Sequence, residues 1–123
     1  MIAASNEPDP GPRCAFQALL CIDDLADALV FLVETYSDAG IVNVGSGEEV
    51  TISELAETVN RVVGYGGTLT FDASKPDGVM RKLVDVSKIN ALGWRHRYGL
   101  AEGLAHTYRW FLEHHADARG LDG

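Results

Sequence analysis

Basic residues and long apolar runs are scarce in this chain. Ten Lys and Arg stand against eighteen Asp and Glu, which gives 123 residues a formal net charge of −8. Such an acidic chain repels nucleic-acid phosphates and anionic lipid. Nowhere do about 18 apolar residues follow one another, as a membrane-spanning helix requires. We therefore expect no nucleic-acid or membrane partner. Because the N-terminus also lacks a basic start followed by an apolar run, we expect a cytoplasmic location.

Cysteine is rare too, since Cys14 and Cys21 are the only two. Nothing else in the sequence points to secretion, so two free thiols are favoured over a disulfide. The adjacent His114 and His115 point to different sides of a helix and do not suit one metal ion. No Ser-His-Asp or Cys-His arrangement is recognisable. The residues alone thus predict no catalytic residue and no metal ligand.

The length allows one compact domain with its own core. It falls short of a two-domain enzyme, because a dinucleotide-binding fold by itself uses six strands with covering helices. The segment before residue 16 is rich in proline and resists both helix and strand. We expect a flexible proline-rich arm over residues 1–15, a single α/β domain over 16–116 and a loose tail over 117–123.

The apolar pattern predicts about three short strands and four helices in a small layered α/β domain with some parallel pairing. The strands are expected at residues 16–22, 41–44 and 68–71. The first helix should begin with Asp23 as its cap, and the second with a capping box of Thr51 and Glu54 and an end at Gly64. A short helix capped by Asp85 is expected at about 86–92, and a longer one at 100–114. The aromatic residues Trp94, Tyr108, Trp110 and Phe111 are interpreted as core.

The first predicted helix is apolar on nearly every side. One stripe holds Leu25, Ala28, Leu29, Leu32 and Tyr36, and the remaining faces hold Ala26, Val30, Phe31 and Val33. Either this domain buries both sides in its own core, or a missing domain or a second copy covers the surplus face.

Two segments are candidates for binding an anion. Gly45-Ser46-Gly47 lies between a predicted strand and a helix, where glycine loops cradle phosphate. It lacks the third glycine of a dinucleotide turn and is followed by Glu48 and Glu49, so a structural turn is favoured.

The second segment holds three of the ten basic residues, Lys75, Arg81 and Lys82, within eight positions. Such a cluster suits a diphosphate, or equally surface pairing with Asp72, Asp77 and Asp85.

Read in order, five blocks of the sequence resemble the C-terminal part of GDP-L-fucose synthases, which are extended short-chain dehydrogenase/reductases. The blocks are IDDLADA at 22–28, NVGSGEEVTI at 43–52, FDASKPDG at 71–78, RKLVDVS at 81–87 with LGW at 92–94, and TYRWFL at 107–112. The resemblance covers about residues 20–115.

This resemblance implies that the chain lacks the catalytic and cofactor-binding residues of the family. Members of the family epimerise GDP-4-keto-6-deoxymannose and reduce it with NADPH, using cofactor and catalytic residues in their N-terminal part. The residues four before Lys75, Lys82 and Lys88 are Phe71, Gly78 and Val84, so no Tyr-x-x-x-Lys exists here. We expect no cofactor site, since NADP belongs to the full-length family.

The resemblance also implies a diphosphate contact at Lys82, with Arg81 and Lys75 as weaker neighbours. In the family, Arg-Glu-Phe-Leu-His-Val precedes the Asp pair, and the Arg helps to hold the sugar nucleotide. Here residues 17–22 read QALLCI, so that charged contact is missing. Residues 79–80, Val-Met, replace the usual Thr-Pro.

Three functional hypotheses remain open. The first is a stand-alone, non-catalytic relative of the substrate-binding portion with at most weak affinity for a GDP-sugar. The second is an interaction module, either a homodimer or larger homo-oligomer or a partner of a separate Rossmann domain. The third is a truncated remnant without present function.

Overall fold

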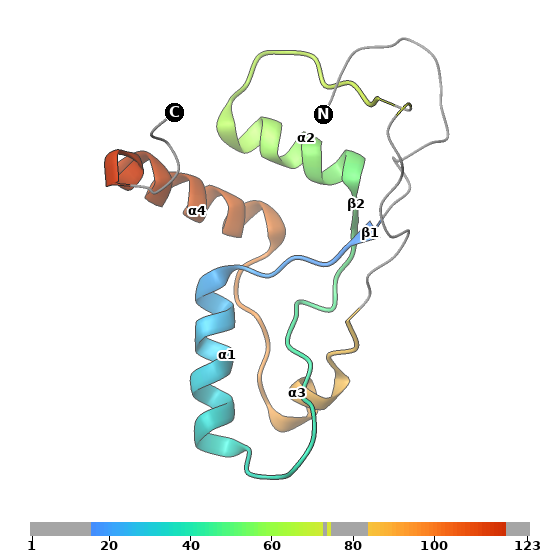
Figure 1. Ribbon diagram of the computed structural model, residues 1–123, viewed down its shortest axis with the longest axis vertical. Coiled ribbons are helices and arrows are strands. Elements are labelled where there is room, and N and C mark those ends of the chain that lie inside the picture. Colours follow the sequence, from blue (N-terminus) through green and yellow to red (C-terminus); the bar gives the residue numbers. More distant parts are fainter. Residues whose placement is uncertain (1–15, 73, 75–83, 118–123) are drawn as a thin grey trace.

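The computed structural model describes residues 16–72, 74 and 84–117, and four α-helices form its frame (Figure 1). The elements in chain order are β1 (Phe16–Gln17), α1 (Ile22–Thr35), β2 (Val50–Thr51), α2 (Ile52–Val63), α3 (Ser87–Leu92), α4 (Leu100–His114) and the 3-10 turn η2 (His115–Asp117). Helices α2 and α4 contact each other at one end of the molecule, and α1 and α3 lie toward the other end. The four predicted helices are therefore all present. None of those described is both long and apolar enough to cross a bilayer.

The N-cap of helix α1 lies two residues earlier than predicted, so its expected cap is wrong. Cys21 is the N-cap and makes no side-chain capping bond. The Asp23 carboxylate instead lies 2.8 Å from His106 Nε2 on α4, so a tertiary contact takes the place of a capping hydrogen bond. Asp23 and Asp24 still place negative charge in the first turn, where the helix dipole favours it.

Helix α2 follows its sequence signals closely. The Thr51 hydroxyl accepts the Glu54 N–H at 3.1 Å, and the Glu54 carboxylate accepts the Thr51 N–H at 2.8 Å. These bonds complete the predicted capping box. The helix ends where Gly64 adopts the left-handed conformation at φ 72°.

The start of α3 differs slightly from expectation, whereas α4 does not. Helix α3 has Val86 as its N-cap, and the Asp85 carboxylate accepts the Ser87 N–H at 2.9 Å from one position further out. Gly93 closes α3 in the left-handed conformation. Helix α4 has the predicted bounds.

The strand predictions are largely wrong. Only Phe16–Gln17 of the first predicted strand pairs, and its partner β2 was not expected; the pairing is antiparallel, with Phe16 opposite Thr51 and Gln17 opposite Val50. Residues 41–44 are not a strand, and of residues 68–71 only Phe71 forms an isolated bridge. A strand needs a neighbouring strand for its hydrogen bonds, and in the described ranges neither segment has a ladder beside it.

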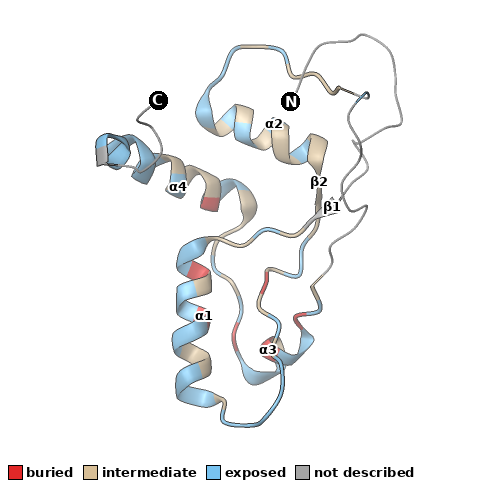
Figure 2. Cartoon of the chain, in the orientation of Figure 1, coloured by how far each residue is buried: buried red, intermediate tan, exposed pale blue. Residues whose placement is uncertain are grey.

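A small core lies between α1, α3 and the segment after α3. Its buried members are Ala28, Val86, Ile89 and Trp94, and partly buried hydrophobic residues surround them: Leu20, Phe31, Leu32, Val42, Val44 and Val84. This core covers only one face of α1. Along the same helix Leu29, Val30 and Val33 are 54%, 59% and 86% exposed. Figure 2 shows exposed residues along much of α1.

The aromatic residues likewise fall into a buried and an exposed group. Trp94 is 4% exposed, but Trp110 is 55% and Phe111 37% exposed, so the interpretation of both as core residues is wrong. Both lie near the C-terminal end of α4, where their rings contact His114 and His115.

Candidate functional site

Two carboxylates in the first turns of α1, those of Asp24 and Asp27, hold the segment that leads into α4. Asp24 is completely buried, and its two oxygens accept the N–H groups of Arg97 at 3.1 Å and Tyr98 at 2.9 Å. The indole N–H of Trp94 donates to Asp27 at 2.9 Å. These bonds fix how α1 lies against the approach to α4, and they satisfy a charge that burial alone would make costly.

The exposed guanidinium of Arg97 adds two longer contacts. Its Nε lies 3.7 Å from Asp24 and its Nη2 lies 3.5 Å from Asp27. In the sequence motif Asp-Asp-x-x-Asp, two of the three carboxylates therefore accept hydrogen bonds from residues far along the chain. The sequence hinted at this role only by containing more carboxylates at this helix start than one helix cap needs.

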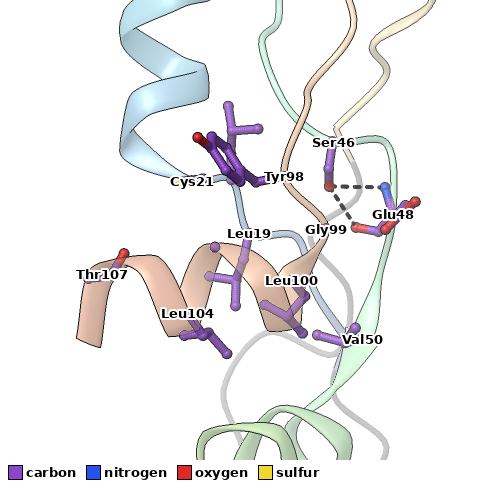
Figure 3. Close-up of a pocket in the computed structure, with 12 residues that line it drawn as sticks. Leu19, Cys21, Ser46, Glu48, Val50, Tyr98, Gly99, Leu100, Leu104 and Thr107 are labelled. Atoms are coloured by element: carbon purple, nitrogen blue, oxygen red, sulfur yellow. Dashed lines mark hydrogen bonds between the residues drawn. The ribbon is translucent and has the colours of Figure 1, made fainter. Parts of the chain in front are cut away.

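Beside this junction a half-open cavity of about 130 Å³ lies between β2, the loop before α1 and the first turns of α4 (Figure 3). Its lining is mostly apolar: Leu19, Leu20, Cys21, Ser46, Glu48, Val50, Tyr98, Gly99, Leu100, Gly103, Leu104 and Thr107. Gly103 permits the close approach of α4, since a Cβ there would lie 3.3 Å from the Cβ of Cys21. Pockets that bind drug-sized ligands measure roughly 300–1,000 Å³. This cavity is therefore too small to enclose a nucleotide sugar.

Two of its polar residues, Ser46 and Glu48, are engaged with each other. The Ser46 hydroxyl accepts the Glu48 N–H at 3.2 Å (Figure 3), and the Glu48 carboxylate lies 3.9 Å from His96 Nε2. Cys21 carries a free thiol in this lining. Among the residues with described positions, no three His, Cys, Asp or Glu side chains gather as a metal ligand set.

The residues predicted to bind the diphosphate, Lys82, Arg81 and Lys75, lie outside the described residues. The two carboxylates that flank them in sequence are described. Asp72 accepts the Ser74 hydroxyl at 2.6 Å and its N–H at 3.0 Å, and these two bonds lower the pKa of Asp72. The hydrogen bond from the Ser87 N–H likewise lowers the pKa of Asp85. Both ends of the basic segment thus carry a carboxylate that stays charged at neutral pH.

The glycine loop has a structural reason for its composition. A Cβ on Gly45 would lie 3.3 Å from Val86 Cγ1, and one on Gly47 would lie 2.8 Å from Val86 Cγ2. Gly47 also has a positive φ of 73°. At Gly47 both the close packing against Val86 and the backbone conformation favour glycine, and at Gly45 an added Cβ would be in tight contact with Val86. These features agree with the interpretation of the loop as a structural turn.

Proteins of known name match nearly the whole chain. No family model matches it. It is 51% identical to a protein named probable GDP-L-fucose synthase 1 of Oryza sativa subsp. japonica, with 89% of this chain matched to 33% of the relative. It is 43% identical to the GDP-L-fucose synthase of Escherichia coli, with 95% of this chain matched to 40% of that protein.

The fold agrees with this similarity. The crystal structure of a GDP-6-OMe-4-keto-L-xylo-heptose reductase from C. jejuni superposes with a TM-score of 0.76 at 32% identity, over 84% of this chain and 32% of the reductase. The chain thus spans about a third of the length of the proteins it matches. Over nearly its whole length this chain is a homologue of the C-terminal portion of the GDP-L-fucose synthases, which are extended short-chain dehydrogenase/reductases.

Proposed function

We propose that the isolated chain is a non-catalytic, sugar-nucleotide-binding portion of this family. In this proposal Lys82 contacts the diphosphate of a GDP-sugar, with Arg81 and Lys75 as weaker neighbours. The observation that carries the proposal is how much of the chain matches the rice relative. The match spans 109 residues, or 89% of the chain, so it includes residues 75–82 wherever it begins. The basic segment therefore lies inside the part that resembles a GDP-L-fucose synthase.

The charges support an anionic ligand at this segment. In a chain of net charge −8, three basic residues within eight positions form a local attraction for a diphosphate. Asp72 and Asp85 flank the segment in the sequence, and hydrogen bonds lower the pKa of each, so both carboxylates are charged at neutral pH. Negative charge on either side of the segment opposes an anionic ligand, and we expect a weak affinity.

The extent of the chain also favours weak binding. Tight sites bury about 70% or more of a ligand's surface. The cavity of about 130 Å³ beside α4 cannot do this for a nucleotide sugar, and the described residues that line the larger hollow of about 430 Å³ beside α2 include no charged side chain to hold a diphosphate. The chain also matches only a third of the rice relative. We expect an affinity in roughly the millimolar range, equivalent to about −4 kcal/mol.

Titration calorimetry with GDP-mannose or GDP-fucose tests this proposal. Heat of binding should appear at millimolar ligand and be lost in Lys82→Ala. Arg109→Ala is the matched control, because it removes one positive charge from an exposed position on α4. Absence of heat for the unmodified chain, or equal heat for Lys82→Ala, would refute the binding role.

The proposal of no catalysis by the isolated chain rests on its sequence. It contains no Tyr-x-x-x-Lys and no glycine turn of the dinucleotide type. No side chain is thereby assigned to protonate a ketone next to a reduced nicotinamide. Mixed with NADPH and GDP-4-keto-6-deoxymannose, the chain should leave absorbance at 340 nm unchanged beyond the buffer rate. Turnover that scales with protein concentration would contradict this.

A second candidate function, an interaction module, is favoured by the exposed apolar face of α1. Leu29, Val30 and Val33 lie more than half exposed on it. Contiguous apolar surface of this kind marks contact sites on soluble proteins. Light scattering over a concentration series measures self-association, and affinity capture measures a separate partner. A strict monomer that captures nothing would remove this candidate.

A further inference from the structure

The hollow of about 430 Å³ beside α2 has the size and lining of a small-molecule site. Its volume falls within the range of roughly 300–1,000 Å³ that is usual for ligand pockets. Helix α2 supplies five apolar lining residues: Ile52, Leu55, Ala56, Val59 and Val63. It also supplies Asn60, and Tyr65 and Leu69 contribute from the segment after the helix. We call the space between these residues the α2 hollow.

Local structure holds the α2 hollow open. The capping box fixes the start of α2, and the Asn60 carbonyl fixes its end by accepting the N–H groups of Gly64 at 3.0 Å and Tyr65 at 3.1 Å. Helix α2 contacts α4 but contains no buried residue. Apolar surface is therefore left beside the helix, and a ligand that covers it gains from the hydrophobic effect.

Asn60 places a hydrogen-bond acceptor in this apolar lining. Its Oδ1 is buried and has no hydrogen-bond partner among the described residues. A buried acceptor without a donor is costly. The terminal torsion of an Asn side chain is soft, so a modest rotation turns the oxygen toward the α2 hollow. A ligand that brings one N–H or O–H group removes the cost.

The ring of Tyr65 gives the α2 hollow an aromatic rim. The ring lies over Gly67, where an added Cβ would collide with it. The absence of a side chain at Gly67 therefore lets the ring take this position, and Tyr65 remains 62% exposed. Aromatic rings pair with other rings in offset or edge-to-face arrangements. The rim thus favours a planar aromatic ligand over a flexible aliphatic one.

We propose that the α2 hollow binds a small, uncharged aromatic molecule with one hydrogen-bond donor, of the kind represented by indole. The apolar side chains of α2 cover its ring, Tyr65 contacts the ring from the rim, and Asn60 Oδ1 accepts its donor. A charged ligand is disfavoured, because no described residue of the lining pairs with its charge. The inference does not depend on GDP-sugar binding.

Titration of the ¹⁵N-labelled chain with indole, followed through its amide chemical shifts, tests the proposal. Indole carries one N–H, and indene has nearly the same shape without this donor. Indole should shift the amides of residues 52–69 saturably, with a dissociation constant on the order of 1 mM. Indene should bind at least about threefold more weakly. Absence of saturable shifts with indole, or equal affinity for the two molecules, overturns the proposal.

Three variants assign the contacts. Asn60→Leu removes the acceptor but keeps a side chain of similar size, so it should bind indole and indene equally. Gly67→Ala displaces the Tyr65 ring and should weaken indole binding at least about threefold. Gly66→Ala is the matched control, because an added Cβ there meets open space. A preference for indole that survives in Asn60→Leu, or equal binding by the two glycine variants, also overturns the proposal.

Two further measurements separate binding from folding and from the GDP-sugar role. Circular dichroism checks that each variant is folded, and Asn60→Leu should be at least as stable as the unmodified chain, since it removes an unpaired buried polar group. GDP-mannose at millimolar concentration should leave indole binding unchanged. Competition between the two ligands would contradict the charge argument and overturn the inference, whereas loss of GDP-mannose binding alone removes only the proposed function.

Discussion

Asp24 is a buried carboxylate that joins α1 to the approach to α4. It has no exposed surface and accepts backbone N–H groups of Arg97 and Tyr98. In the sequence its place in the first turn of a helix suggests only a favourable charge at the helix dipole. Its actual partners lie more than seventy residues further on, and only the folded arrangement reveals them.

We predict that Asp24→Asn destabilises the protein by about 2 kcal/mol. One carboxylate oxygen becomes an amide N–H₂, which faces a backbone donor instead of accepting from it. Urea unfolding measures the loss. Asp38→Asn, on the exposed loop after α1, is the control and should leave the midpoint unchanged. Identical midpoints for both variants would show that the Asp24 charge is not needed.

A second residue-scale prediction concerns Gly47. Its φ is 73°, and a Cβ there would lie 2.8 Å from Val86 Cγ2. Gly47→Ala should therefore lower the free energy of unfolding by about 1–2 kcal/mol from backbone strain, plus the cost of displacing Val86. Gly66→Ala is the matched control, since an added Cβ at that position meets only open space. Thermal unfolding of the two variants should differ clearly, and equal melting temperatures would argue against a tight fit at Gly47.

At the scale of elements, local signals predicted helices far better than strands. The capping box of α2 and the left-handed glycines after α2 and α3 act within a few residues, so the sequence displays them directly. Residues 41–44 have the composition of a strand, but a strand exists only beside another strand. No local pattern can tell whether that neighbour is present.

The capping box makes the stability of α2 depend on pH. Hydrogen bonds from the Thr51 N–H and hydroxyl lower the pKa of Glu54 in the folded state. The charged form is thus favoured by folding, and its stabilisation is present above the unfolded pKa of about 4.3 and is lost as pH falls through the lowered folded value. Glu54→Gln should therefore show a smaller drop in melting temperature than the unmodified chain between neutral pH and about pH 3.

Glu57→Gln provides the comparison for this experiment. It removes a carboxylate from an exposed position on the same helix, outside the capping box. Its acid-induced drop should match that of the unmodified chain. If Glu54→Gln and Glu57→Gln lose stability equally, the capping box contributes nothing to acid sensitivity.

At the scale of the whole molecule, the order of the blocks along the chain was the strongest signal. IDDLADA and NVGSGEEVTI pointed to the C-terminal portion of GDP-L-fucose synthases, and the identities of 51% and 43% bear this out. The candidate site was less accessible. Lys75, Arg81 and Lys82 remain predictions, because they lie outside the described residues.

The burial of individual side chains was harder to predict from the sequence than the protein family. Trp110 and Trp94 look alike in the sequence, each near apolar neighbours, yet one is 55% and the other 4% exposed. Trp94 follows the glycine that ends α3 and reaches Ala28 and Asp27 on α1, contacts between elements distant in sequence. Trp110 lies on a face of α4 that the described part of the chain leaves open.

The two tryptophans therefore report on whether α1 is oriented as described. In Trp110→Phe only Trp94 remains, and its emission should be blue-shifted and several-fold less quenched by acrylamide than that of Trp94→Phe, which keeps Trp110. Unfolding should abolish the difference. Trp94 is shielded by the contacts that also leave Leu29, Val30 and Val33 on the exposed side of α1. Equal quenching of the two variants would therefore contradict the packing of α1 against Trp94.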